Sequence, residues 1–190
     1  SIKQGDIVNF LGMSREVADY RDNSGEQALW TNAMFSGMPT TQISMKYEGD
    51  WLSSGLTKLF RLGLPAPIFF LFVYFIGFYI LSLSLRIKPL VGVIGSLAFG
   101  FSSYFIVILE AGHNSKAAAI GFAPLMIAGF IMAYRNKNWI LGAALSSAFM
   151  AVELAANHVQ ITYYMAFILL LLGIVELVRH FKSNQLPKPE

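Results

Sequence analysis

The chain has 190 residues, of which 55% are hydrophobic and only 13% are charged, with a formal net charge of +3. Soluble domains carry about 25% charged residues, so this composition excludes an ordinary soluble protein and indicates an integral membrane protein. There is no cysteine, which excludes disulfides and thiolate chemistry, and the basic residues fall in short separate clusters, which argues against a nucleic-acid partner.

Residues 1–63 come before the apolar half of the chain, and we expect them to form a folded loop domain outside the membrane. The segment from Ser14 to Asp22 predicts a short helix, with Ser14 as its N-cap and Gly25 as its stop. Residues 28–45 are rich in Gly, Pro, Asn and Thr, which disfavours regular structure. The chain begins at Ser1 without a start methionine, so we expect a membrane helix or signal upstream and further helices downstream.

A second short helix is predicted at the end of this loop domain. From Trp51 to Leu62 the apolar residues recur at helical spacing, and Lys58 and Arg61 fall on the other side. This pattern is typical of an amphipathic helix that lies in the membrane interface.

Five apolar segments follow, and each is close to the ~20 residues that a membrane-spanning helix needs. They cover residues 64–85, 89–109, 117–134, 139–156 and 161–178. The predicted fold is therefore all-α: a polytopic transmembrane helix bundle of about five spans over residues 64–182, with a cytoplasmic tail or linker at 183–190.

Two sets of polar residues alternate at the ends of these segments. One set is basic and the other holds carboxylates and imidazoles: Arg86, Lys88, Arg135, Lys137, Arg179 and Lys182 against Glu110, His113, Asn114, Lys116, Glu153, Asn157, His158 and Gln160. A chain that crosses the membrane at each segment puts the two sets on opposite sides, and basic loops mark the cytoplasm. We therefore expect residues 1–63 and the second set outside, and the tail inside.

The densest cluster of reactive side chains lies at the outer end of the second predicted span, where Gly112 allows a tight turn. Glu110, His113 and Lys116 offer a carboxylate, an imidazole and an ammonium group, which suit a cation or a phosphate. Lys116 also opens the third span, where the helix dipole attracts anions. The alternative is that these residues form a hairpin between two membrane helices that is polar only because it is exposed to water.

A second cluster lies at the outer end of the fourth span. Glu153 falls about one turn inside the apolar segment, where an ionised carboxylate needs a partner or water, although an interfacial acid is the simpler reading. His158 and Gln160 could bind sugar hydroxyls or phosphate oxygens. Near the cytoplasmic end, we expect Glu176 to pair with Arg179 or His180.

Three runs carry a resemblance to a known family: QGDIVNFLGMSREVADYRDNSGEQALWTNAMFSGMPTTQIS, EAGHNSKAAAIGFAPLMIAGF and ELAANHVQITYY. In this order they resemble the amino-terminal part of the YfhO family, bacterial polytopic membrane proteins regarded as glycosyltransferases of the GT-C architecture. The resemblance implies a location in the bacterial cytoplasmic membrane, a polyprenyl-phosphate-linked sugar as donor, and a cell-envelope glycopolymer or a protein as acceptor.

The resemblance also implies roles for individual residues. GT-C enzymes use an acidic residue in the first outer loop, which corresponds here to Asp6, although a lone aspartate in such a position is otherwise read as a solvated acid. Asp6, Glu110 and His113 would form the catalytic site and hold a divalent cation, Mg²⁺ or Mn²⁺, as a candidate cofactor. Lys116, His158, Gln160 and Glu153 would bind the donor.

Two other classes of function stay open. A transporter or flippase of a lipid-linked sugar would use discontinuous helices around a polar site at mid-depth. The residues that could break helices are Pro124, Gly92, Gly95, Gly100, Gly121 and Gly129, but the ionisable residues lie near the ends of the predicted spans. The second open class is a membrane scaffold without enzymatic activity. The sequence holds no P-loop, zinc-protease or nucleophile-elbow motif, so a nucleotide-sugar donor is unsupported.

Overall fold

The computed structural model describes residues 4–44, 50–135 and 138–185. Nearly all the regular structure in these ranges is helical, which confirms the all-α class. The elements in chain order are α1 Gly5–Met13, α2 Arg15–Ser24, β1 Trp30–Thr31, β2 Met38–Pro39, a 3₁₀ turn Thr40–Gln42, α3 Trp51–Arg61, α4 Ala66–Ser84, α5 Pro89–Gly100, α6 Ser103–Ala111, α7 Asn114–Arg135, α8 Trp139–Ala155 and α9 Val159–Gln185.

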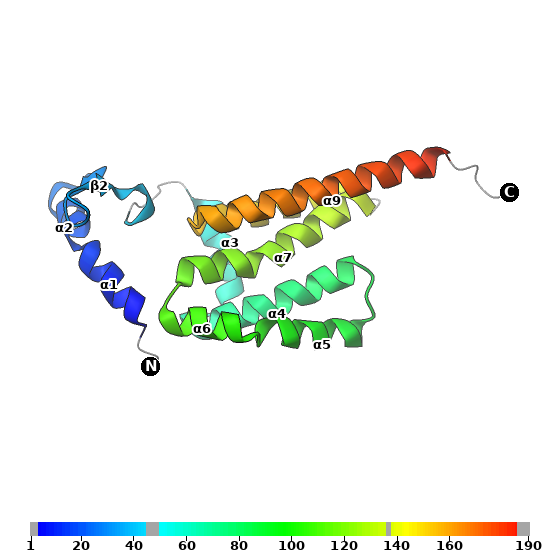
Figure 1. Cartoon of the computed structure of the whole chain (residues 1–190), viewed down its shortest axis with the longest axis horizontal. Coiled ribbons are helices and arrows are strands. Elements are labelled where there is room, and N and C mark those ends of the chain that lie inside the picture. The colour runs from blue at the N-terminus through cyan, green and yellow to red at the C-terminus, as the bar shows by residue number, and fades with distance from the viewer. Residues whose placement is uncertain (1–3, 45–49, 136–137, 186–190) are drawn as a thin grey trace.

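The long helices run alongside one another, and α1, α2 and the β1–β2 hairpin lie beyond one end of them (Figure 1). We call this the cap end; the α6–α7 and α8–α9 turns lie there. The α4–α5 turn and the carboxyl ends of α7 and α9 lie at the opposite, basic end. The two alternating polar sets of the sequence are thus separated in space.

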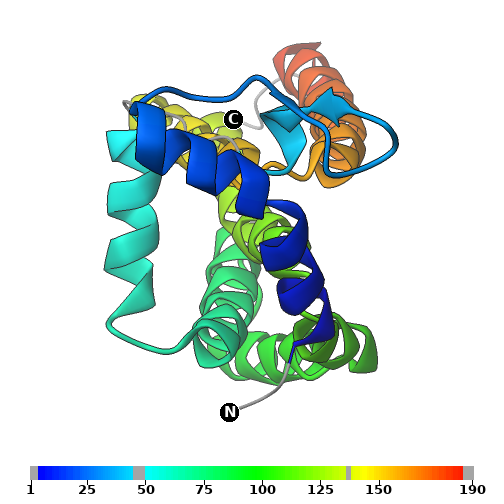
Figure 2. The ribbon, with the colours of Figure 1, turned by 90° about the vertical axis from the view of Figure 1, so that its left-hand side faces the viewer.

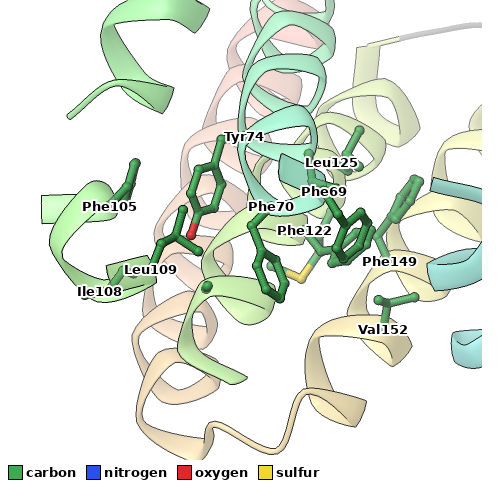
Figure 3. Close-up of a cluster of buried hydrophobic side chains, with 13 residues drawn as sticks. Phe69, Phe70, Tyr74, Phe105, Ile108, Leu109, Phe122, Leu125, Phe149 and Val152 are labelled. Atoms are coloured by element: carbon green, nitrogen blue, oxygen red, sulfur yellow. The ribbon is translucent and has the colours of Figure 1, made fainter. Parts of the chain in front are cut away.

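Helix α7 is the centre of the bundle and contacts α4, α6, α8 and α9. The core is aromatic: Phe69, Phe70 and Tyr74 of α4, Phe105 of α6, Phe122 of α7 and Phe149 of α8 are all buried (Figure 3). Apolar burial between helices gains little over burial in lipid, so close packing of these rings is what holds such a bundle together.

Within the described part of the chain, three helices are long and apolar enough to cross a membrane: Ala66–Ser84, Asn114–Arg135 and Val159–Lys182. The predicted span 89–109 is two helices, α5 and α6, which are bent by 44° and make a fourth candidate if they count as one span. The segment 139–156 contains α8, an apolar helix of 17 residues. The structure therefore supports three or four spanning helices by length and composition.

The bend between α5 and α6 follows Gly100, where a Cβ atom would lie 2.3 Å from the ring of Phe75. The sequence indicated that Pro124, Gly121 and Gly129 could also break helices, but α7 continues through all three. The glycines serve close packing instead: a Cβ atom on Gly129 would lie 2.5 Å from the backbone nitrogen of Ser146 in α8.

Helix α3 confirms the predicted amphipathic helix, and it is joined to the bundle. Its Leu56 and Phe60 pack against the core, and the Phe60 ring meets those of Phe122 and Phe149, each with a centroid separation of 5.7 Å. Figure 2 shows α3 lying across the cap end, alongside the ends of the long helices. The segment predicted as a loop domain therefore includes one helix of the core.

The remainder of the predicted loop domain, residues 4–44, forms the cap. Gly25 ends α2 in the left-handed conformation (φ 73°), as predicted. Ser14 occupies the predicted N-cap position of α2 but makes no side-chain cap hydrogen bond, because its hydroxyl donates to the carbonyl of Phe10 at 2.8 Å. Glu16 of α2 holds the hairpin by accepting from the Thr31 hydroxyl at 2.6 Å and the Asn32 amide at 3.0 Å.

At the basic end, Glu176 is buried although it is a carboxylate. The predicted contact with Arg179 is present at 3.3 Å, and the stronger partner is Arg135 of α7, whose Nε donates to Glu176 at 2.9 Å. Helix α9 continues to Gln185, so the predicted tail begins as helix, and residues 186–190 lie outside the described part of the chain.

Candidate functional site

The cap brings Asp6 to the α6–α7 turn. Asp6 lies in the first turn of α1, and its Oδ2 is 3.2 Å from Nε2 of His113, which precedes α7. Both side chains are about half exposed, at 50% and 48%. Two of the three predicted catalytic residues, far apart in the sequence, therefore meet on a surface that an external substrate could reach.

Gln4 and Gly112 explain how α1 is held in this position. The Gln4 side chain donates to the carbonyl of Leu109 at 2.6 Å and to Asn114 Oδ1 at 3.3 Å. Gly112 ends α6 with φ 97°, and a Cβ atom there would lie 2.9 Å from Gln4 Cβ and 3.1 Å from Ile7 Cγ1. Only glycine leaves room for α1 to contact this turn so closely.

Lys116 and His158 extend the site toward the α8–α9 turn. Burial lowers the pKa of His158, and the nearby positive charge of Lys116, followed by His113, lowers it further. The three side chains are thus electrostatic neighbours. His158 Nδ1 is buried and has no hydrogen-bond partner within the described part of the chain. Because the imidazole is held neutral, the ammonium group of Lys116 is the positive charge in this neighbourhood that would attract an anion.

The cap also reaches the α8–α9 turn directly, because the Asn157 amide donates to the Thr41 carbonyl at 3.1 Å. Asn157 adopts a positive φ of 54°, which asparagine tolerates better than most residues. The cap is therefore attached to both turns that carry the candidate residues.

Glu153 and Gln160, the other two predicted donor-binding residues, are not shown in contact with Asp6, His113, Lys116 or His158 in the described part of the chain. Glu153 is 1% exposed, and both its oxygens accept from the Thr162 hydroxyl of α9, at 2.9 and 3.0 Å. Gln160 is exposed and donates to the Tyr164 hydroxyl one turn further along α9, at 2.9 Å. Glu153 thus links two helices, and Gln160 lies on the surface of α9.

Glu110, the third predicted catalytic residue, is exposed at the end of α6 and has neither a hydrogen bond nor an ion pair to the residues that the structure describes. Over residues 4–44, 50–135 and 138–185, no three His, Asp or Glu side chains group closely enough to hold a metal ion. The contact that the structure shows is the pair of Asp6 and His113.

Sequence reasoning missed Gln4 and Thr162. Gln4 carries no local signal, because its partner Leu109 is 105 residues away and is a backbone carbonyl. Gly112 was recognised as a turn residue, yet its role as a contact surface for α1 depends on the tertiary fold.

No protein-family model, curated protein or solved structure matches the chain. The resemblance to the YfhO family and the chemistry that it implies therefore stay predictions that depend on the residues described above.

Proposed function

We propose that this protein is a membrane glycosyltransferase that transfers a sugar from a polyprenyl-phosphate donor to a cell-envelope acceptor. The observation that supports this most is the contact of Asp6 with His113 beside Lys116 and His158. A carboxylate, an imidazole and a cationic side chain at one exposed site are the groups that such a transfer needs: a base for the acceptor and a binding site for the donor phosphate.

In the proposed reaction, a hydroxyl oxygen of the acceptor forms a bond to the anomeric carbon of the sugar. The bond from that carbon to the phosphate oxygen breaks, and polyprenyl phosphate leaves. The hydroxyl proton passes to the Asp6–His113 pair, in which the carboxylate stabilises the imidazolium that forms.

The donor phosphate would lie against Lys116 and His158. Lys116 supplies a positive charge in the first turn of α7, where the helix dipole also favours an anion. His158, whose pKa is lowered mainly by burial, would supply the buried Nδ1 as a polar contact.

The proposed topology has five spans, with the cap end outside the bacterial cytoplasmic membrane and the basic end in the cytoplasm. It follows from the excess of Arg and Lys at the basic end. A cysteine at Asn114 or Asn157 should react with an impermeant thiol reagent in intact cells, and one at Lys88 should not. If the cysteine at position 88 reacts and those at 114 and 157 do not, the chain has the opposite orientation in the membrane.

The experiment that tests the activity is Asp6→Asn, because an amide keeps the size of the side chain but lacks the negative charge that stabilises the imidazolium of His113. We expect conversion of the lipid-linked sugar to polyprenyl phosphate to fall roughly 100-fold or more, with unchanged expression in the membrane. Asp19→Asn is the matched control, since Asp19 is an exposed cap acid that pairs only with Arg15, at 3.7 Å, among the residues described. Equal activity of the two variants would remove Asp6 from the mechanism.

The bend between α5 and α6 favours a second candidate, a transporter or flippase of the lipid-linked sugar, because broken helices are common in transporters. Purified protein in detergent distinguishes the two functions. A glycosyltransferase releases polyprenyl phosphate there, whereas a flippase has no activity without two separated leaflets.

A further inference from the structure

A groove of about 430 Å³ lies beneath α3, between that helix and the cap ends of α4, α7 and α8. One side is polar and comes from α3, and the other is apolar. The residues that matter here are Ser54, Thr57, Lys58 and Arg61 on the polar side, and Phe69, Phe70, Phe122 and Val152 on the apolar side. A groove of this composition fits a ligand with a polar head and an apolar chain.

The position of α3 sets the depth of this groove in a membrane. Leu56 and Phe60 pack α3 against the bundle, and α3 lies across the cap end of the long helices (Figure 2). Amphipathic helices in this orientation lie at the boundary between headgroups and acyl chains. Lys58 and Arg61 are exposed on α3, and an interfacial position of this helix would put them at the level of lipid phosphates.

The charged side chains around the groove favour a ligand with a negatively charged head. Asp50 lines the groove at the start of α3, and Lys58 and Arg61 line it near the end. Along the helix, Asp50 and Lys58 are separated by roughly 12 Å at 1.5 Å per residue, so the carboxylate does not neutralise the two cations. Arg61 is held in place by its Nε, which donates to the Leu64 carbonyl at 3.2 Å. The carboxyl-terminal half of the groove is therefore cationic.

We propose that this groove binds one anionic phospholipid of the surrounding leaflet. The phosphate lies between Lys58 and Arg61, with the Thr57 hydroxyl as a further donor, and one acyl chain follows Phe69 and Phe70. Charge complementarity and the depth of α3 support a bilayer lipid as the ligand. The site differs from the one proposed for catalysis, because Asp6, His113, Lys116 and His158 do not line the groove.

The test uses the whole chain in vesicles that contain a phosphatidylglycerol with a photoreactive group on its acyl chain. Ala118 and Ala156 line the groove and are partly exposed, so a lipid in the groove can contact them. We expect labelled peptides at these two positions. Lys58→Gln with Arg61→Gln should lower that labelling about 10-fold or more, because each Lys or Arg near an anionic lipid contributes roughly a factor of five.

Arg86→Gln with Lys88→Gln is the matched control, since it removes the same charge from the basic end and should leave this labelling unchanged. Three results would overturn the proposal without any variant: equal labelling by a photoreactive phosphatidylcholine, no labelling at Ala118 and Ala156, or displacement of phosphatidylglycerol by an equimolar polyprenyl phosphate. The measurement needs no sugar transfer, so its failure and that of the proposed function are distinct.

Discussion

Gly112→Ala is the smallest change that should detach α1 from the α6–α7 turn. The new methyl group would lie 2.9 Å from Gln4 Cβ and 3.1 Å from Ile7 Cγ1, closer than carbon atoms pack. Overpacking of this kind costs about 1 to 3 kcal/mol. The substitution also strains the backbone at φ 97°, by about 1 to 2 kcal/mol, whether or not α1 is docked.

The contacts that hold α1 on this turn are few. The two hydrogen bonds of Gln4 contribute about 1 kcal/mol each, and the half-exposed contact of Asp6 with His113 contributes about 0 to 1 kcal/mol. Their sum is similar to the cost of the clash, so the docking equilibrium should fall about 5- to 150-fold and undocked α1 should become populated.

The assay is pulsed electron–electron resonance between spin labels on Val8→Cys and Ser115→Cys, both exposed positions in a chain without native cysteine. We expect a narrow distance distribution in the parent and a broad one in Gly112→Ala. Gly25→Ala is the control, because Gly25 has φ 73° but nothing within 4 Å of its Cβ position. An unchanged distribution in Gly112→Ala would refute the reasoning.

Three further predictions concern stability, measured as thermal unfolding in detergent. The pKa of His158 is lowered in the folded chain, mainly by burial, so protonation of this residue favours the unfolded chain. The free energy of unfolding should therefore be highest above the unfolded pKa of about 6.5 and should decrease as pH falls below it. His158→Gln should make the transition temperature less sensitive to acid. Arg135→Gln should cost about 1 to 3 kcal/mol, because buried Glu176 loses its main donor, and an unchanged transition would contradict that role. Gly142→Ala should lower the transition temperature, since its Cβ would lie 2.3 Å from the α7 backbone, whereas Gly55→Ala, with nothing within 4 Å, should not.

Hydropathy and charge predicted much of the fold, because the membrane imposes a length and a sign on each segment. The apolar runs correspond to α4, α7, α8 and α9, and the two polar sets lie at opposite ends. Gly100 was among the glycines expected to be able to break a helix, and α5 does end there, but the sequence could not distinguish it from Gly121 and Gly129, through which α7 continues. The prediction that Pro124 could break a helix was wrong, because α7 continues through this buried residue.

The candidate site was predicted in part. The family resemblance implied that Asp6 and His113 share a site, and the alternating topology put both on the same side of the membrane, but neither could resolve the side of each helix that faces the site. In α6 the buried stripe is Phe105, Ile108 and Leu109, and Glu110 falls on the exposed side of it. The register of a helix against its neighbours, which the apolar run alone did not fix, decides such questions.

The attachment of α9 has a mechanical consequence. Only 6% of its apolar window is buried, and its polar links to the bundle stand near its two ends, Thr162 to Glu153 and Glu176 to Arg135. Apolar side chains in a bilayer gain little by packing on protein instead of lipid, so these two links, together with Met165 and Leu169 packed against the core, hold the tilt of the helix. Releasing the link at Glu176 would leave α9 attached mainly near its cap end, so its carboxyl-terminal half could change its tilt in the bilayer without breaking the aromatic core.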